Sequence, residues 1–299
     1  KRLSQVDEWF SRKSCAAGLT ALIYWRLPVA EQQVIRQVFR DSLLPDDNPI
    51  VRRAAVNAVK ALGLESGRGD AEPWGEWIEM LAGLVDDQQD SVRLLLVDAL
   101  VAVGERWRAT GVDDEQLATL VFDLCCKLIA DRSWRVRFMA ATGYAGLMRT
   151  IGVPAASQSS FDGVAAFAGL LTDYEAEVRA AAAGQAAAVA ALWAGEAFEA
   201  RVLPVLDRVV LDPSAQVRAA LACQLNDLCA VAGEQVTLDR LLPLFLVLFR
   251  DDSSQVRLNV ISRLDVINRV IGIEALRHHL VPPIVKLCED RQWRVRQAI

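Results

Sequence analysis

Histidine is almost absent from this chain of 299 residues, which contains only His278 and His279. Because the two residues are adjacent, their imidazoles cannot share one face of a helix and cannot act as a pair. The chain also lacks HExxH, GxSxG, P-loop and GxGxxG motifs with the flanks that those motifs need. Its carboxylates are plentiful but are spread along the chain. We therefore expect no catalytic site, no enzyme activity and no cofactor.

Cysteine pairs with CxxC spacing are missing as well. The six cysteines sit among apolar residues: Cys15, Cys125, Cys126, Cys223, Cys229 and Cys288. This pattern favours buried, reduced thiols in a cytoplasmic protein, with a nuclear location also open. The acid pairs Asp86–Asp87 and Asp251–Asp252 have the chemistry to bind calcium. Solvated turn acids are nevertheless the default reading, so we predict no metal site.

Basic residues are not in excess, since 33 Lys and Arg face 38 Asp and Glu and the net charge is −5. A general nucleic-acid binder would usually show a basic face, so we expect no nucleic-acid partner. Long apolar runs are absent too. The longest uncharged stretch, Ala180 to Gly195, is alanine-rich and shorter than the roughly 20 apolar residues that span a bilayer. With no signal peptide in sight, we expect a soluble protein without a membrane span.

What the chain does contain is a repeat. A Val-Arg pair occurs seven times, and each arginine follows an aspartate by six residues: Asp46/Arg52, Asp87/Arg93, Asp131/Arg137, Asp173/Arg179, Asp212/Arg218, Asp251/Arg257 and Asp290/Arg296. Successive arginines are 39 to 44 residues apart. A fixed period of this size means one supersecondary unit copied in series, with a continuous core through the stack. We predict an all-α solenoid, although the length alone would allow two globular domains.

Each period predicts two antiparallel helices. Apolar residues three and four positions apart, as in Leu203, Leu206 and Val209, indicate a first helix, A, and a second helix, B, begins near the Val-Arg pair. The predicted A helices are 28–44, 72–85, 113–130, 158–172, 196–211, 237–250 and 273–289. The predicted B helices are 9–25, 48–62, 90–108, 133–151, 175–194, 214–231 and 253–270. The complete repeats are then about 28–63, 72–110, 113–152, 158–195, 196–232 and 237–272, with partial repeats at 1–25 and 273–299.

Neither end of the chain has the polar face of a capping repeat, so we expect a fragment of a longer array. Prolines add local detail. Pro28 and Pro73 suit the first turn of an A helix. Pro204, Pro243 and Pro282 lie about one turn inside their predicted helices and should bend them.

The repeated aspartate and arginine have a structural reading. The aspartate in the A-to-B turn can accept hydrogen bonds from N–H groups at the start of helix B and favours the positive end of that helix. The arginine is expected to point toward the turn of a neighbouring repeat. Alternating Asp and Arg would then form a ladder that keeps the repeats in register, contributing specificity more than net stability.

The position three residues before each arginine behaves differently. It holds Trp9, Pro49, Asp90, Trp134, Ala176, Ala215, Ser254 and Trp293. Because alanine and serine are accepted there, packing does not demand tryptophan, and an exposed indole is typical of a protein interface. We predict partner contact at Trp9 and Trp134; the alternative is that each indole folds over its own neighbouring turn. We interpret the remaining tryptophans as core or inter-repeat filler: Trp25, Trp74, Trp77, Trp107 and Trp193.

These turn sequences resemble a known family. The repeat is that of HEAT repeats, and an ordered set of segments is similar to the scaffold, or A, subunit of protein phosphatase 2A. The segments are DDNPIVRRAA (46–55), DDQQDSVRLL (86–95), DRSWRVRFM (131–139), EAEVRAAAA (175–183), the run 241–272 and LVPPIVKLCEDRQWRVRQAI (280–299). The linker at 63–73, the stretch 152–162 and the alanine-rich helix at 180–194 depart from the family's pattern.

The resemblance implies a function. In that family the turns form a ridge that receives a regulatory B-type subunit, while the catalytic phosphatase subunit binds further along, mostly outside this chain, giving a heterotrimer rather than a homo-oligomer. The residues matching the family's regulatory contacts are Trp9, Asp47, Pro49, Arg52, Arg53, Asp87, Asp90, Trp134 and Glu177. Arg52 has a double role because it also belongs to the ladder.

Two alternatives stay open. A transport adaptor of the karyopherin class also uses helical repeats, but the armadillo type carries W-x-x-x-N, whereas Trp134 is followed by Phe138 and Trp293 by Gln297. An enzyme with a helical-repeat body would need a clustered active site, which the sequence does not show.

Overall fold

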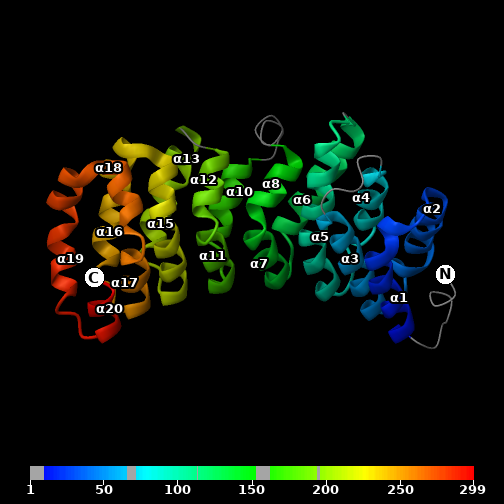
Figure 1. Ribbon diagram of the computed structural model, residues 1–299, viewed down its shortest axis with the longest axis horizontal. Coiled ribbons are helices and arrows are strands. Elements are labelled where there is room, and N and C mark those ends of the chain that lie inside the picture. Colours follow the sequence, from blue (N-terminus) through cyan, green and yellow to red (C-terminus); the bar gives the residue numbers. More distant parts are fainter. Residues whose placement is uncertain (1–9, 66–71, 113, 153–161, 194–195) are drawn as a thin grey trace. The chain divides into compact units, whose positions relative to one another are not determined.

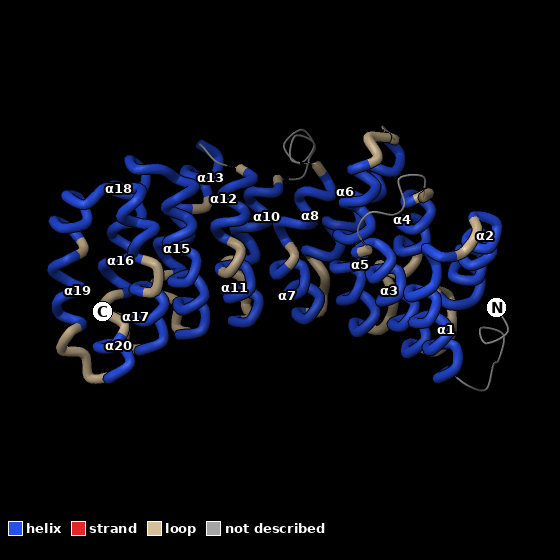
Figure 2. The backbone as a smooth tube through the Cα atoms, viewed as in Figure 1, coloured by secondary structure: helices blue, strands red, loops and turns tan. Residues whose placement is uncertain are grey.

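The chain forms helical hairpins that fall into two compact units, Lys1–Phe161 (unit 1) and Asp162–Ile299 (unit 2). The computed structural model describes residues 10–65, 72–112, 114–152, 162–193 and 196–299. Every regular element in these residues is a helix, which confirms the all-α prediction (Figures 1 and 2). None of these helices combines the length and the apolar character needed to cross a membrane.

Unit 1 contains three complete A-to-B turns. Its A helices are α2 (Val29–Val38) with the π-helical turn η3 (Phe39–Leu43), α4 (Trp74–Ala82) and α6 (Glu115–Ile129). Its B helices are α1 (Phe10–Ile23), which continues into the 3-10 turn η2 (Tyr24–Arg26), α3 (Pro49–Leu64), α5 (Asp90–Ala109), and the pair α7 (Trp134–Thr142) and α8 (Tyr144–Ile151). Helix α3 packs between α1 and α5, and α5 packs against α7 and α8. The B helices therefore stack in chain order.

Unit 2 has the same order of elements in shorter pieces. Its A helices are α10 (Gly163–Leu170), the pair α13 (Glu196–Arg201) and α14 (Leu203–Val209), the π-helical turn η4 (Thr237–Leu241) with α16 (Leu242–Leu248), and α19 (Val281–Leu287). Its B helices are α11 (Ala176–Ala183), α12 (Ala186–Leu192), α15 (Ala215–Val236), α17 (Ser254–Ile261), α18 (Leu264–His279) and α20 (Trp293–Gln297). Helix α15 packs against α11 and α12, and also against α17 and α18.

The valine of each Val-Arg pair is a core residue. All seven side chains have no exposed surface: Val51, Val92, Val136, Val178, Val217, Val256 and Val295. Each valine lies in the first turn of its B helix, so its burial anchors the start of that helix in the core. The repeated motif thus marks the inner end of each A-to-B turn.

Large aromatic rings fill the core of unit 1. Tyr24, Phe39 and Trp77 are fully buried, and the rings of Phe39 and Trp77 meet edge to face with centroids 5.4 Å apart. Most polar groups of this cluster find partners inside it: Glu72 accepts hydrogen bonds from the Tyr24 hydroxyl (2.5 Å) and the Trp77 indole (2.9 Å), and Nη1 of Arg36 donates to the Tyr24 hydroxyl (2.7 Å), while Nε of Arg36 is buried without a hydrogen bond. A buried polar network is favourable only when its members find partners in this way.

The predicted role of the other tryptophans as core or inter-repeat filler holds for four of them, since three are buried and the ring of Trp25 packs against that of Trp74 in a different repeat, with centroids 5.8 Å apart. Trp74, Trp77 and Trp107 are buried. Trp25 and Trp193 are only half-buried. Both half-buried residues lie at the ends of helices, where fewer neighbours surround a side chain.

Prolines divide the A helices of unit 2. Pro204, Pro243 and Pro282 each lie at the second position of a new helix, namely α14, α16 and α19. The sequence predicted bends inside continuous helices; the structure instead has a new helix starting at each proline. The reason is that proline lacks an N–H and its ring clashes with the carbonyl four residues earlier.

Three predicted B helices are also each divided in two: 133–151, 175–194 and 253–270. The divisions fall at Gly143, Gly184 and Ser262. Glycine is a poor residue for a helix interior. Ser262 donates its hydroxyl to the carbonyl of Asn259 (2.8 Å), a local bond that competes with the helical pattern.

The prediction that the cysteines are buried is wrong for half of them. Cys125 and Cys229 are buried and Cys126 is half-buried, but Cys15, Cys223 and Cys288 are exposed. Burial raises the pKa of the Cys126 thiol to about 11, so this thiol is protonated near neutral pH. The exposed cysteines lie among apolar residues in the sequence but on the outer faces of their helices, which composition alone does not reveal.

Candidate protein-binding ridge

Each A-to-B turn is closed by its aspartate. The Oδ1 atom accepts a hydrogen bond from the N–H two residues later, at 2.7 to 3.0 Å, in all seven turns: Asn48, Gln89, Ser133, Glu175, Ser214, Ser253 and Gln292 are the donors. These donors are the N-cap residues of the following B helices. The aspartate therefore fixes the turn that leads into the helix, rather than capping the helix itself.

The arginines of unit 1 tie successive turns together. Arg52 donates from Nε and Nη2 to the two carboxylate oxygens of Asp87, at 2.7 and 3.0 Å. Arg93 holds Asp131 in the same two-pronged way, at 2.7 and 2.8 Å. Such paired contacts match the planar geometry of guanidinium to that of carboxylate. The turns of unit 1 consequently lie side by side and form a ridge.

Unit 2 repeats the arrangement three times. The pairs are Arg179 with Asp212, Arg218 with Asp251, and Arg257 with Asp290, with Nε to Oδ2 distances of 2.7, 2.6 and 2.7 Å. In both units Nη1 of the arginine also donates to the backbone carbonyl of its own turn's aspartate, including Arg137 to Asp131 (2.9 Å) and Arg296 to Asp290 (2.6 Å). Asp173 fixes the first turn of unit 2 through its bond to the N–H of Glu175.

The first rung of unit 1 was not predicted. Lys13 donates from Nζ to Oδ2 of Asp46 at 2.7 Å. Its helix begins without a Val-Arg pair. The available signal was that Lys13 follows Asp7 by six residues, which is the spacing of the Asp and Arg residues in the other turns.

Two ladder aspartates, Asp131 and Asp251, have lowered pKa values. Burial alone would raise the pKa of Asp131, but the Arg93 guanidinium and the Ser133 N–H hold that pKa below its ordinary value. Asp251 is affected in the same way by Arg218. In the two acid pairs that were expected to be solvated turn acids, Asp87 and Asp251 are instead bound by arginines with little exposed surface, whereas Asp86 and Asp252 are exposed. No group of three His, Cys, Asp or Glu in the part of the chain that the structure describes is placed to hold a metal ion.

The residues matched to regulatory contacts lie in different settings. Asp47 and Glu177 are exposed, and Pro49 and Arg53 are half-buried at the start of α3. Asp90 accepts a hydrogen bond from the hydroxyl of Ser133 (3.0 Å) in the next turn. Arg52 and Asp87 bind each other as described above, with little of the Asp87 side chain exposed. A partner can therefore reach Asp47, Arg53 and Glu177 directly, whereas Arg52 and Asp87 shape the ridge.

Trp134 is the aromatic residue of the unit 1 ridge. It is the first residue of α7 and is 38% exposed, with the Arg135 guanidinium 5.8 Å from its ring. In unit 2, Trp293 occupies the same turn position and is 57% exposed. Trp9 lies outside the described residues. The sequence argument missed Tyr174, which follows Asp173 in the first turn of unit 2 and is 99% exposed.

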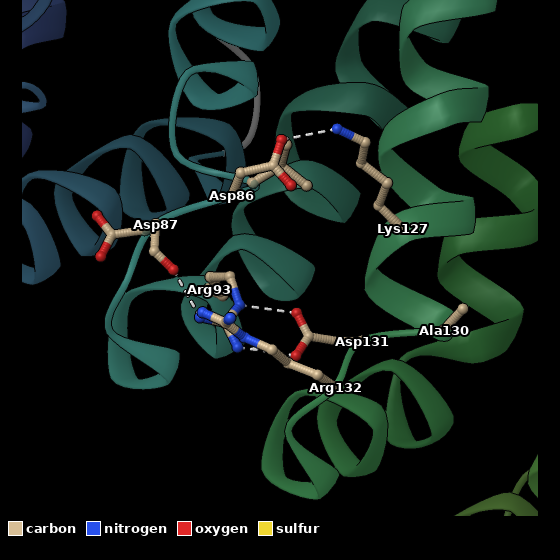
Figure 3. A pocket seen from close by; sticks show the side chains of 8 residues that line it. Asp86, Asp87, Arg93, Lys127, Ala130, Asp131 and Arg132 are labelled. Carbon is tan, nitrogen blue, oxygen red and sulfur yellow. Dashed lines mark hydrogen bonds and ion pairs between the residues drawn. The ribbon is translucent and has the colours of Figure 1, made fainter.

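Hollows separate the turns of unit 1. One, of about 470 Å³, lies between the turn that contains Asp47 and the turn that contains Gln88. The next, of about 450 Å³, is lined by Asp86, Lys127 and Arg132 as well as the ladder residues. Figure 3 shows Arg93 reaching Asp131 across this second hollow, while Asp86 turns toward Lys127, to which it is bonded at 2.7 Å. The ridge thus alternates projecting turns with recesses that present charges of both signs.

Comparison with known proteins finds similar repeats. Residues 162–233 match the family model described as PPP2R1A-like HEAT repeat. The A-type regulatory subunit of protein phosphatase PP2A from Schizosaccharomyces pombe is 36% identical over 156 residues, which is 51% of this chain and 25% of that protein. The chain is thus similar to these A-type subunits over about half of its length. The resemblance inferred from the turns is confirmed.

Other relatives carry the same name. The A-type regulatory subunit of PP2A from Saccharomyces cerevisiae is 32% identical over 144 residues, 47% of this chain and 22% of the relative. The beta isoform of the human 65 kDa A-type regulatory subunit is 44% identical over 70 residues, 22% of this chain and 11% of the relative. This HEAT-repeat chain spans about a quarter or less of the length of the curated relatives it matches.

Solved structures support the fold. A structure of Kap95p bound to RanGDP matches with a TM-score of 0.71 at 14% identity, covering 99% of this chain and 38% of that one. Kap121p bound to the SUMO protease Ulp1p matches with a TM-score of 0.62 at 14% identity, covering 96% and 30%. At this identity the likeness is one of helical-repeat fold and does not extend to transport function.

Proposed function

We propose that this chain is part of a non-catalytic scaffold of a serine/threonine phosphatase holoenzyme. A regulatory B-type subunit binds along the ridge, and the scaffold holds it beside the catalytic subunit in a heterotrimer. The relatives are named as regulatory subunits of PP2A, and they are 36% and 32% identical to this chain over 156 and 144 residues. Holding two proteins on one scaffold raises the effective concentration of each for the other without any chemistry by the scaffold.

The observation that carries this proposal is the setting of Trp134. Its turn is fixed by the bonds of Asp131 to Arg93 and of Arg137 to the Asp131 carbonyl, yet the indole itself keeps more than a third of its surface exposed. A rigidly placed, partly exposed tryptophan loses little conformational freedom on binding, which is typical of an interface anchor.

The charges around the anchor indicate what the partner must present. Arg132 and Arg135 are exposed beside Trp134, whereas Asp47 is exposed at the first turn of unit 1. A matching partner surface has acidic residues opposite the third turn of unit 1 and basic residues opposite the first. Complementarity of this kind sets the orientation of a complex more than its affinity.

Replacing Trp134 with alanine tests the proposal. We expect Trp134→Ala to keep the helicity and melting temperature of the chain and to weaken capture of a purified B-type regulatory subunit by at least ~1 kcal/mol, measured by calorimetric titration. Trp293→Ala is the matched control, because it removes a more exposed indole from the same turn position in unit 2. Unchanged affinity of Trp134→Ala, or equal weakening in both variants, would contradict the proposal.

A further inference from the structure

The hollow below the first two turns of unit 1 continues away from the ridge. A second recess, of about 160 Å³, lies between the ends of η3 and α4. It shares Leu44, Pro45, Gly83 and Leu84 with the larger hollow of about 470 Å³. The two recesses therefore adjoin and form one groove, which we call the Gly83 groove. It runs from the ridge onto the surface between two A helices.

The absence of a side chain at residue 83 opens this groove. Gly83 lies four residues before the ladder aspartate Asp87. In five other turns the corresponding position carries a side chain: Ser42, Lys127, Arg208, Val247 and Lys286. Gly83 is exposed, has the right-handed backbone angles φ −61° and ψ −15°, and an added Cβ would meet only the carbonyl oxygen of Met80 at 3.5 Å. Neither backbone conformation nor crowding requires glycine here, so the open space is not explained by packing.

The groove has an apolar floor and an acidic end. Leu44, Leu84 and Met80 form the floor next to Pro45. At the ridge end lies the exposed carboxylate of Asp47, with which no described cationic side chain pairs. The neighbouring carboxylates are already bound, Asp46 by Lys13 and Asp87 by Arg52. The unpaired charge at this end of the groove is therefore negative.

We propose that the Gly83 groove receives an extended segment of the regulatory subunit that carries an aliphatic side chain beside a lysine or arginine. The inference rests on the scaffold function proposed above and adds a second contact to it. The aliphatic side chain enters the recess over Leu44 and Leu84, where it is removed from water. The basic side chain meets Asp47. A recess of this size suits one side chain, so a single anchor is expected rather than a buried helix face.

Filling the groove from within tests this proposal. Gly83→Leu places a side chain in the recess without backbone strain, and Gly83→Ala fills it in part. Gly169→Leu is the matched control, since Gly169 also lies four residues before a ladder aspartate, is exposed, and has nothing within 4 Å of an added Cβ. With a purified B-type regulatory subunit, we expect Gly83→Leu to weaken binding about tenfold, Gly83→Ala by less, and Gly169→Leu not at all.

The outcomes separate the groove from the ridge. Wild-type affinity in Gly83→Leu, or the same loss in Gly169→Leu, overturns the groove proposal; the scaffold function then stands if Trp134→Ala still weakens binding. Absence of any binding by the unmodified chain overturns both. Asp47→Asn gives an independent reading, because loss of a charge pair should reduce the dependence of affinity on salt concentration. If the salt dependence of the affinity is unchanged in Asp47→Asn, the bound segment has no basic residue opposite Asp47.

Discussion

Units 1 and 2 carry the same ladder on helices that differ in continuity, although one B helix of unit 1 is also divided, at Gly143. In unit 1, α3 and α5 run without a break over 16 and 20 residues. In unit 2, three A helices begin anew at a proline, and the kinks at Gly233 and Gly272 mark where a B helix ends and the next A helix begins within α15 and α18. Yet the distances from arginine Nε to aspartate Oδ2 are the same to within 0.1 Å, for example 2.7 Å for Arg93 and 2.6 Å for Arg218. The turn motif therefore sets the register of the repeats independently of the helices behind it.

The far ends of the B helices differ as well. In unit 1, Arg106 donates from Nε to the carbonyl of Gly63 (2.9 Å) at the end of α3, and Arg108 donates to that of Thr150 (2.8 Å) in α8. The helices approach closely here, because a Cβ at Gly63 would lie 2.8 Å from the backbone of Ala102. In unit 2, the glycines at the kinks have open space around them. Unit 1 is thus fastened at both ends of its B helices.

The largest effect is expected from a buried charge in unit 2. Val217 has no exposed surface, so Val217→Asp places an unpaired carboxylate in the core and should cost roughly 3–5 kcal/mol. Hydrogen exchange should show loss of protection in α15 and its neighbours. The exposed neighbour provides the control, as Gln216→Asp should leave exchange unchanged. If Val217→Asp instead unfolds both units in one step, the two units do not differ in how they respond to a buried charge.

A smaller effect is expected from breaking one of the Arg–Asp pairs of the ladder. Arg93→Ala leaves Asp131 without its partner in a nearly enclosed site and should destabilise unit 1 by about 3 kcal/mol in urea unfolding. Arg218→Ala should cost less, since the Arg218 side chain is more exposed. In the double variant Arg93→Met/Asp131→Leu, much of the loss should be recovered, because no charge is left unpaired. Equal losses in the two single variants would argue against burial as the deciding factor.

Replacing a glycine with alanine should change stability in opposite directions in the two units. Gly233 has φ 82° and ψ 177°, a conformation that is essentially confined to glycine, so Gly233→Ala should destabilise unit 2 by about 1–3 kcal/mol. Gly18 lies in α1 with nothing within 4 Å of an added Cβ, so Gly18→Ala should stabilise unit 1 by about 0.5–1 kcal/mol. Thermal melts of both variants give the comparison. A neutral Gly233→Ala would mean that the kink relaxes into ordinary helix.

Lowering the pH should produce the smallest difference in stability between the two units. The folded-state pKa values of Asp131, Asp251 and Asp290 are lowered, so their contribution is present above the unfolded value of about 3.9 and is lost as pH falls through the folded values. Unit 2 contains two of these three residues and should lose exchange protection first below pH ~4. Asp251→Asn should flatten this dependence in unit 2. If exchange protection is lost first in unit 1, Asp251 and Asp290 do not account for the acid sensitivity of the protein.

Much of the architecture could be predicted from the sequence. The period of the Val-Arg pair indicated the hairpins, their order and the buried valines, because a repeat presents the same local pattern many times. Helix continuity could not be predicted from apolar spacing: the pattern is equally regular through Gly143 and Ser262, where the helices divide. The exposure of Cys223 could not be predicted either, because whether a helix face is covered or exposed depends on which neighbour packs against it.

The sequence by itself determined the repeat and the partners of the ladder, because an aspartate and an arginine six residues apart occupy fixed places in each short turn. Only the tertiary structure decided which surfaces remain available. Whether the indole of Trp134 is covered and whether Gly83 faces a groove both depend on the adjacent turn, which lies about 40 residues away in the chain. Exposure is a property of stacked neighbours, and no single repeat contains that information.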